Sequence, residues 1–371
     1  MLKGLFNNIF DGLTTFVTGH TGFKGSWLAT WLVEMGANVV GFSLAEPPTV
    51  PSNFELSGLG GRITDVRGDV RDLEQLREAV EIHQPELIFH LAAQPIVLRS
   101  FEQPRITFDT NAGGTVNVLE AVRTTNSVRA LVSITTDKVY EDQGWLWGYR
   151  ENDRLGGYEP YSASKAMAEL AIASYRQSFF PPERYAEHGV AIASARAGNV
   201  IGGGDFAAHR LVPDSMGALA AGETIQIRNP LSVRPWQYVL EPLSGYLLLA
   251  AKLLNDGAEY AESWNYGPKE KQGVSTQELV EKLIELWGLG RWLQTQKPGD
   301  VKKETEYLRL NWDKAAALLG WQPVYSLEET LAEITVWYRA YQSKSDMLEV
   351  GREQIGEYVR RAEEMNLNWA Q

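Results

Sequence analysis

The sequence predicts an α/β fold with a doubly wound parallel sheet and a second, smaller lobe of mixed α/β structure. The first half of the chain alternates strand-like with helix-like segments, and repeated β-α units form parallel sheets. A glycine-rich turn directly follows the first strand-like run, as it does in many doubly wound sheets. The length of 371 residues exceeds the usual limit of one hydrophobic core. We therefore expect two lobes.

Hydrophobic periodicity places the elements of the first lobe. Short apolar runs predict strands, and a period of about 3.6 residues predicts helices. The strands are expected at 14–18, 38–42, 86–91, 130–134 and 190–194, and the helices between them at 24–35, 72–83, 111–124 and 162–178.

The second half of the chain has a different texture. After Asn199, glycines and prolines interrupt short strand-like segments, and isolated helices are expected at 276–287 and 327–341. The Pro181-Pro182 break favours a boundary there. We expect a first domain at 1–182, to which the chain returns at about 236–255, and a second domain at 183–371 over the carboxyl ends of the strands.

Composition excludes several classes of function. The net charge is −12 and no Lys/Arg-rich block is present, which argues against nucleic acid or an anionic membrane as the partner. The chain has no cysteine, so disulfides, a thiolate nucleophile and a zinc-thiolate site are excluded. The five histidines lack metal-ligand spacing, and we expect no metal. No signal peptide or membrane span is apparent, so we expect a cytoplasmic protein.

The first strand is followed by the segment Gly19-His-Thr-Gly22-Phe-Lys-Gly25. Glycines at this spacing allow a tight turn and let a helix amino terminus face a pyrophosphate, as in the Rossmann dinucleotide site. An ordinary strand-to-helix turn is the alternative for this motif alone. Asp69-Val70 at adenine distance and the strand end Leu91-Ala92-Ala93 favour the dinucleotide site.

Ser43 stands where an acidic residue would commonly hold the adenosine ribose of NAD. No arginine follows for a 2′-phosphate, so this position does not decide between NAD and NADP. A hydroxyl contact to the ribose suggests loose holding of the cofactor.

Two further motifs predict sugar redox chemistry. Tyr161 and Lys165 lie one helical turn apart, so the ammonium can lower the phenol pKa and make Tyr161 a general base. Thr136 and Asp137 follow the strand at 130–134 and supply a hydroxyl and an acid. The alternatives are a helix-surface pair for Tyr161 and Lys165, and a turn cap for Asp137.

These motifs, together with Asn111-Ala-Gly-Gly-Thr115, resemble those of the extended short-chain dehydrogenases/reductases. The Thr136-Asp137 pair narrows the resemblance to the nucleotide-sugar 4,6-dehydratases. The segments 136–140, 145–151 and 232–238 are similar to those of the CDP-glucose 4,6-dehydratase family. The cofactor residues that the resemblance implies, with NAD as cofactor, are Gly19, Thr21, Gly22, Phe23, Gly25, Ser43, Asp69, Val70, Leu91, Ala92, Ala93, Asn111, Thr135, Tyr161 and Lys165.

The resemblance implies a hydro-lyase that converts CDP-glucose into a 4-keto-6-deoxy sugar, a step in deoxysugar biosynthesis. Tyr161 would take the proton of the 4-hydroxyl, which Thr136 orients, while NAD takes the hydride from C4. Asp137 would protonate the leaving oxygen at C6, and the hydride would return to C6. Gln94, Asn199, Arg210 and Arg234 are the implied substrate-binding residues. A surface ion pair is the alternative for either arginine.

Lys138 stands where the dTDP-glucose enzymes carry a glutamate as the base at C5. A lysine acts as a base only when it is neutral, and burial beside other cations favours the neutral amine. As an ammonium, Lys138 would instead stabilise the C4 enolate. The sequence leaves both roles open.

Two other functions compete with dehydration. A nucleotide-sugar 4-epimerase shares the fold but has no use for an acid at Asp137 beside a C5 base. A cofactor-sensing regulator would not need Tyr161 and Lys165. A 4,6-dehydratase for another nucleotide-hexose is a further alternative. We expect Trp145 and Trp147 to form a substrate wall, and a homodimer through the helices that start near Asn111 and Tyr161.

Overall fold

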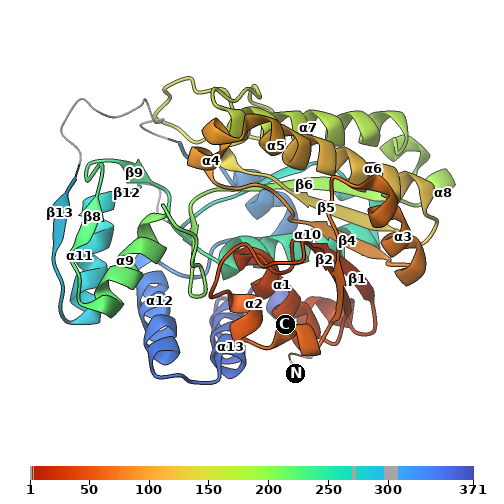
Figure 1. The fold of residues 1–371 in the computed structure, drawn as a ribbon. Coiled ribbons are helices and arrows are strands. Elements are labelled where there is room, and N and C mark those ends of the chain that lie inside the picture. The colour runs from red at the N-terminus through yellow and green to blue at the C-terminus, as the bar shows by residue number, and fades with distance from the viewer. Residues whose placement is uncertain (1, 3, 270–272, 296–307) are drawn as a thin grey trace.

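A seven-stranded sheet forms the centre of the computed structural model, which describes residues 2, 4–269, 273–295 and 308–371. The strand order is β11-β6-β5-β4-β1-β2-β3, and every neighbouring pair is parallel. The predicted doubly wound sheet is confirmed (Figure 1). Its strands are β1 (Thr14–Thr18), β2 (Asn38–Ser43), β3 (Thr64–Arg67), β4 (Leu87–His90), β5 (Ala130–Ile134), β6 (Ala191–Ala197) and β11 (Ser263–Tyr266).

The sequence-based prediction found five of these strands and missed β3 and β11. The four residues of β3, Thr-Asp-Val-Arg, are mostly exposed at the sheet edge and form no apolar run. β11 is also only four residues long, Ser-Trp-Asn-Tyr, and joins the opposite edge beside β6. A strand of four residues is too short for the apolar run or the alternation on which such predictions depend.

Helices cover both faces of the sheet (Figure 1). One face carries α3 (Leu73–His83), α6 (Gly114–Thr124) and α7 (Pro160–Ser178), and the other carries α1 (Phe23–Glu34) and α10 (Leu240–Asp256). Successive strand residues point to opposite faces, so β5 sends Leu131 into the core that includes α6 and Val132 into the core that includes α10. This double burial explains why the central strands read as continuous apolar runs.

The predicted helices agree with the structure to within one or two residues, with one exception. The segment expected as one helix at 111–124 begins as a π-helical turn, η3 (Asp109–Gly113), which continues into α6. The prediction gave no helix for α9 (Leu211–Ala221), α10 (Leu240–Asp256) or α13 (Met347–Glu364), the last of which is rich in charged residues although its inner side is buried. The remaining helices are α2 (Asn53–Leu56), α4 (Val97–Glu102), α5 (Pro104–Phe108), α8 (Tyr185–His188), α9 (Leu211–Ala221), α11 (Thr276–Trp287), α12 (Leu327–Gln342) and α13 (Met347–Glu364).

A smaller group of elements lies to one side of the sheet (Figure 1). It contains α9, α11 and α12 and three two-stranded pairs: β7 (Val200–Ile201) with β10 (Gln237–Tyr238), β8 (Ile225–Ile227) with β13 (Trp292–Gln294), and β9 (Val233–Arg234) with β12 (Val274–Ser275). Between these segments the chain returns to the main sheet through α10 and then β11. The exact division into domains stays a prediction. No helix among the described residues is long and apolar enough to cross a bilayer.

Candidate active site

The turn between β1 and α1 is shaped by glycines. Gly19 has a φ of +77°, and a Cβ there would lie 2.8 Å from the nitrogen of Ala92. A Cβ at Gly25 would lie 2.1 Å from the carbonyl oxygen of Gly19. No side chain fits at either position, so α1 starts close to the strand, with its unpaired N–H groups at the carboxyl edge of the sheet. This cradle, which includes Thr21 and the first helical residue Phe23, fits a dinucleotide pyrophosphate.

Ser43, at the end of β2, braces this turn. Its hydroxyl lies 3.0 Å from Nδ1 of His20 and accepts a 3.5 Å hydrogen bond from the backbone N–H of Thr21. Nε2 of His20 lies 2.9 Å from Asp65. Burial lowers the pKa of His20, although Asp65 opposes this effect. The hydroxyl of Ser43 is therefore already engaged inside the protein, and its contact with the ribose stays a prediction.

The predicted adenine corner is fixed against its neighbours. Asp69 forms an ion pair with Arg71 at 2.5 Å, and the hydrogen bonds from Arg71 lower the pKa of the carboxyl, so it is ionised at neutral pH. The carbonyl of Val70 accepts a 2.8 Å hydrogen bond from Asn117 on α6. A Cβ at Gly114 would lie 2.9 Å from Val70, so the glycine lets α6 approach this corner.

A buried histidine aligns the next strand end. Nδ1 of His90 lies 2.8 Å from the hydroxyl of Thr18, and Nε2 lies 3.0 Å from the hydroxyl of Thr115. The Thr18 hydroxyl also accepts a 3.2 Å hydrogen bond from the N–H of Ala92. Burial and the charge of Lys165 lower the pKa of His90 to about 3. The neutral ring therefore connects β1, β4 and α6 just below the predicted cofactor contacts at Leu91, Ala92 and Ala93.

Asn111 and Gln94 are both used within the protein. Asn111 accepts a 2.8 Å hydrogen bond from the N–H of Gln94 and donates to the carbonyl of Gln94 at 3.1 Å and to Ser164 at 2.9 Å. The amide of Gln94 donates to Thr107 at 2.9 Å. These bonds hold the segment after β4 against α7. The predicted contacts of Asn111 with the cofactor and of Gln94 with the substrate stay predictions.

The end of β5 presents Asp137 in a fixed orientation. The Thr136 hydroxyl donates to one carboxylate oxygen at 2.9 Å, and the Asn199 amide donates to the other at 3.3 Å. A Cβ at Gly198 would lie 2.0 Å from the carboxylate, so this glycine makes room for the acid. Thr136, and not Asp137, caps the short helix η4 (Asp137–Val139) through the N–H of Lys138. The structure therefore does not support the alternative of a capping role for Asp137.

Lys138 differs from its neighbours because it is only half-buried. Within the ranges that the structure describes, its ammonium has no hydrogen-bond or ion-pair partner. The ammonium is therefore not engaged by another described side chain.

Tyr161 and Lys165 lie on the first turns of α7 and are both buried. The ammonium of Lys165 donates to the carbonyl of Ile134 at 3.1 Å, and burial lowers its pKa to about 8. Burial raises the pKa of Tyr161 to about 12, opposed by a hydrogen bond with Thr136 and increased by the charge of Asp137. The pKa of Tyr161 is therefore raised and not lowered as the sequence predicted, and the groups that oppose burial are Thr136 and Arg210, not Lys165. The structure does bring Tyr161, Thr136 and Asp137 together.

Lys24 is a site residue that the sequence-based reading missed. It lies on the first turn of α1, and its ammonium is 5.8 Å from the centre of the buried Tyr246 ring. Burial and the charges of Lys165 and Arg210 lower its pKa to about 7, while Asp137 opposes them. Its position between Gly22 and Gly25 could have marked it as a candidate site residue. The sequence does not show that its side chain lies near Lys165 and Asp137.

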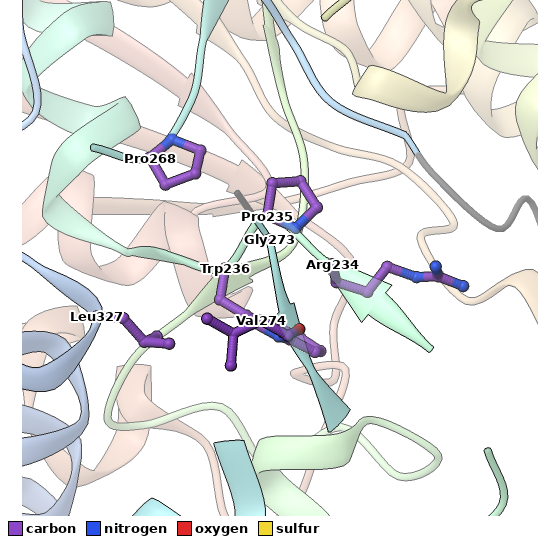
Figure 2. A pocket seen from close by; sticks show the side chains of 7 residues that line it. All are labelled: Arg234, Pro235, Trp236, Pro268, Gly273, Val274 and Leu327. Atoms are coloured by element: carbon purple, nitrogen blue, oxygen red, sulfur yellow. The ribbon is translucent and has the colours of Figure 1, made fainter. Parts of the chain in front are cut away.

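The two predicted substrate arginines have different surroundings. Arg210 precedes α9 and pairs with Asp205 at 2.9 Å, and its charge also reaches Tyr161. Arg234 lies on β9 beside a small hollow between β9, β12 and the start of α12. Figure 2 shows its guanidinium extending away from Leu327 on the far side of this hollow. Both arginines are thus local cations in an acidic protein.

The aromatic loop after Lys138 forms a continuous stack. Tyr140 stacks on Tyr149 with 5.1 Å between ring centres, and Tyr149 stacks on Trp145 at 5.4 Å. Trp147 follows at 5.5 Å and is 58% exposed. The predicted role of Trp145 and Trp147 as a substrate wall is not tested by these contacts.

Comparison with known proteins agrees with this arrangement. A model of the family described as GDP-mannose 4,6 dehydratase matches residues 16–334. The chain belongs to this family. It is 47% identical over 353 residues to the CDP-glucose 4,6-dehydratase of Salmonella typhimurium, with 95% of this chain and 98% of that protein covered. The predicted membership of the nucleotide-sugar 4,6-dehydratases is confirmed.

Solved structures show the same fold as this member of the GDP-mannose 4,6-dehydratase family. A Thermus thermophilus UDP-glucose 4-epimerase in complex with NAD is 25% identical, with a TM-score of 0.72 and with 88% of this chain and 99% of that chain covered. A dTDP-glucose 4,6-dehydratase of Bacillus anthracis in complex with NAD is 22% identical, with a TM-score of 0.74 and coverages of 91% and 100%. Among the described residues, no three His, Asp or Glu side chains cluster as metal ligands.

Proposed function

We propose that the chain is an NAD-dependent hydro-lyase that converts CDP-glucose to CDP-4-dehydro-6-deoxyglucose, a step in deoxysugar biosynthesis. The observation that carries the proposal is the oriented carboxylate of Asp137 beside Tyr161 and Thr136, with Lys138 as the next residue in the chain. A 4-epimerase needs the tyrosine but neither the acid nor its neighbour. The identity of 47% to the Salmonella CDP-glucose enzyme favours CDP-glucose over the sugar in the family's description.

Each catalytic side chain has one task. Tyr161 removes the proton of the sugar 4-hydroxyl, which Thr136 orients from the end of β5. NAD, held by the glycine turn between Gly19 and Gly25, would supply the acceptor for the hydride of C4 and the donor of a hydride to C6. Asp137 protonates the departing oxygen at C6, and Lys138 acts at C5. The protons balance as follows: Asp137 gives one proton to the water that leaves, and the proton removed at C5 is replaced at C5. The proton that Tyr161 takes from the 4-hydroxyl is released to solvent, and Asp137 takes one proton from solvent.

Local cations hold the anionic substrate. The diphosphate of CDP-glucose would contact Arg210 and Arg234, whose planar guanidinium groups suit phosphate oxygens, while Asn199 would contact the diphosphate beside its bond to Asp137. The ion pair of Arg210 with Asp205 keeps the guanidinium in place before the substrate arrives. The residues of the cofactor site are those of the glycine turn, the corner at Asp69 and the strand ends described above.

The active enzyme is proposed to be a cytoplasmic homodimer that joins through the helices near Asn111 and Tyr161. This assembly is supported by apolar side chains that α4, α5 and α7 leave on one side of the molecule. Light scattering at micromolar concentration should give twice the mass of the 41.4 kDa chain, and a monomer would contradict the dimer. The exposed side chains are Leu98, Ile106, Met167 and Leu170, with exposed fractions of 38%, 39%, 49% and 59%.

One assay tests the proposed activity. The purified chain is incubated with NAD⁺ and CDP-glucose, dTDP-glucose, UDP-glucose or GDP-mannose in parallel, and 4-keto-6-deoxy sugars are measured by their absorbance in alkali. We expect product from CDP-glucose at a rate at least tenfold above the others. An epimerase would give CDP-galactose without the alkaline chromophore, and a cofactor-sensing protein would give neither product. Either result would reject the proposal.

A further inference from the structure

A buried carboxylate lies one helical turn beyond Lys165 on α7. Glu169 is 2% exposed and accepts hydrogen bonds from the hydroxyl of Thr135 at 2.5 Å and of Ser194 at 2.8 Å. It also forms an ion pair with Arg196 on β6 at 2.7 Å. Burial opposes the charge of Glu169, but Arg196 and the hydroxyl donors outweigh it and lower the pKa. The carboxylate is therefore ionised in the interior.

Thr135 links this carboxylate to the catalytic groups. It is the first residue after β5 and directly precedes Thr136 and Asp137. Its hydroxyl donates to Glu169, so α7 holds the end of β5 in place through Glu169 and carries Tyr161 two turns earlier in the same helix. The contact of Thr135 with the cofactor stays a prediction, whereas its hydrogen bond to Glu169 is observed.

Arg196 is held from the other side. Its second amino group donates to the hydroxyl of Tyr140 at 2.7 Å and to the carbonyl of Glu151 at 3.0 Å. The guanidinium also lies 5.1 Å from the centre of the Tyr140 ring. Because Tyr140 and Glu151 hold the guanidinium in place, its ion pair with Glu169 keeps the carboxylate within reach of Thr135.

The charged groups around Lys165 make Glu169 important for its protonation. Lys24 faces it from α1 and His90 from β4, and neither is an anion. On α7 itself, Tyr161 precedes it and Glu169 follows it. Glu169 is the group whose negative charge opposes the effect of burial on Lys165.

We propose that Glu169 is a positioning residue of the reaction: it fixes the end of β5 through Thr135 and keeps Lys165 protonated beside Tyr161. This inference rests on the proposed function. When the Tyr161 and Lys165 pair holds one proton between them, only the phenolate with the ammonium can accept the substrate proton. A negative charge closer to Lys165 than to Tyr161 favours that arrangement over the neutral phenol with the neutral amine.

Loss of the charge should therefore have two effects. In Glu169→Gln the active arrangement becomes less populated at every pH, and the pair loses its last proton at a lower pH. We expect the maximal rate of NADH formation from CDP-glucose to fall about tenfold and the alkaline limb of its pH profile to move down by about one unit. Both are measured in a single turnover by absorbance of NADH.

The matched variants separate charge from packing. Ser194→Ala removes one hydrogen bond to Glu169 but leaves its charge, so its alkaline limb should stay where it is in the parent protein. Glu169→Asp should keep the limb as well. Because Glu169→Gln leaves Arg196 unpaired and can fail to fold, Glu169→Gln with Arg196→Met provides a neutral pair, and its limb should move down like that of the single variant.

A second measurement does not require activity. Lysine labelled with ¹³C at the ε-carbon is followed by NMR in the protein without substrate, and the Lys165 signal is assigned by its loss in Lys165→Met. Its midpoint should lie near pH 8, as burial dictates, and about one unit lower in the neutral double variant. An unchanged midpoint together with an unchanged alkaline limb would overturn the inference. Absence of any NADH from CDP-glucose in the parent protein would instead reject the proposed function.

Discussion

Two strand-to-helix turns meet at the carboxyl edge of the sheet, and they are built in opposite ways. The turn from β1 to α1 is defined by missing side chains, since a Cβ at Gly19 or Gly25 would overlap the backbone. The turn after β5 is defined by side chains that cannot be omitted, because Thr136 and Asn199 orient Asp137. An added side chain should therefore disrupt the first turn, whereas removal of Thr136 or Asn199 should leave the Asp137 carboxylate without its orienting hydrogen bonds.

This contrast separates binding from chemistry. A glycine turn exposes backbone N–H groups and holds a pyrophosphate by shape, with little dependence on pH. The chemistry at the turn after β5 also depends on groups of α7 whose charge state is set by burial, as the opposite pKa shifts of Tyr161 and Lys165 show. Substitutions in the first turn should therefore lower the affinity for NAD⁺, whereas substitutions of the catalytic groups should lower the rates of single reaction steps.

The largest effect is expected at Tyr161. Tyr161→Phe removes only the phenol oxygen, so NADH formation in a single turnover should fall by about 10⁴, the upper range of general-base catalysis. Binding of NAD⁺, measured by calorimetry, should stay within about threefold because the glycine turn is untouched. Persistent NADH formation would place the base at another residue.

Asp137→Asn should break the catalytic turn at a later step. Oxidation at C4 does not need an acid at C6, so NADH should still form, whereas elimination of water should slow by about 10³. Reduced cofactor and a 4-keto, 6-hydroxy intermediate should then accumulate, as measured by absorbance and mass spectrometry. If oxidation is lost while the circular dichroism spectrum is unchanged, Asp137 positions the substrate instead.

Gly25→Ala tests the other turn. Its methyl group would lie 2.1 Å from the carbonyl oxygen of Gly19, so the turn must shift. The affinity for NAD⁺ should fall by about 10², and overpacking should lower the free energy of unfolding by about 1–3 kcal/mol. Gly61→Ala is the matched control, because nothing lies within 4 Å of its added methyl group. Equal losses of NAD⁺ affinity in Gly25→Ala and Gly61→Ala would show that the glycine turn has no special role in cofactor binding.

The sequence predicted the cofactor turn and the catalytic motifs because both are local. Glycine spacing and the interval from Tyr161 to Lys165 can be read within seven residues of the chain. The partners of Ser43 and Asp137 could not be predicted in this way, because His20 and Asn199 reach them only after folding. The same reason hid the ion pair of Glu169 with Arg196, whose members lie 27 residues apart in the sequence.

The sequence also could not predict the direction of the pKa shift of Tyr161, because burial is its largest cause. The spacing of Tyr161 and Lys165 correctly predicts that the two share a helix face, and from this the sequence-based reading expected a lowered phenol pKa. In the structure burial raises that pKa to about 12. Sequence spacing reports which groups are near each other, but the depth of the site decides the sign of the shift.

Substitution of Lys138 is expected to have the smallest effect on the reaction. It tests whether the turn after β5 supplies the base at C5. If Lys138 is the base at C5, Lys138→Met should slow solvent deuterium exchange at C5 of the intermediate, measured by NMR, but leave NADH formation intact. The loss should be about 50-fold, slightly below the usual range of base catalysis, because the 4-ketone already acidifies this carbon.

The companion variant Lys138→Arg distinguishes the two roles of Lys138. An arginine keeps the positive charge but cannot accept a proton at neutral pH, so exchange should be as slow as in Lys138→Met if the amine is the base. We expect this result, because Asp137 already serves C6 and Lys138 has an ammonium without a partner among the described residues. Exchange at the parent rate in Lys138→Arg would show that the charge alone stabilises the enolate. The turn after β5 would then contribute an electrostatic field at C5 and a proton transfer at C6, while Tyr161 on α7 transfers the proton at C4.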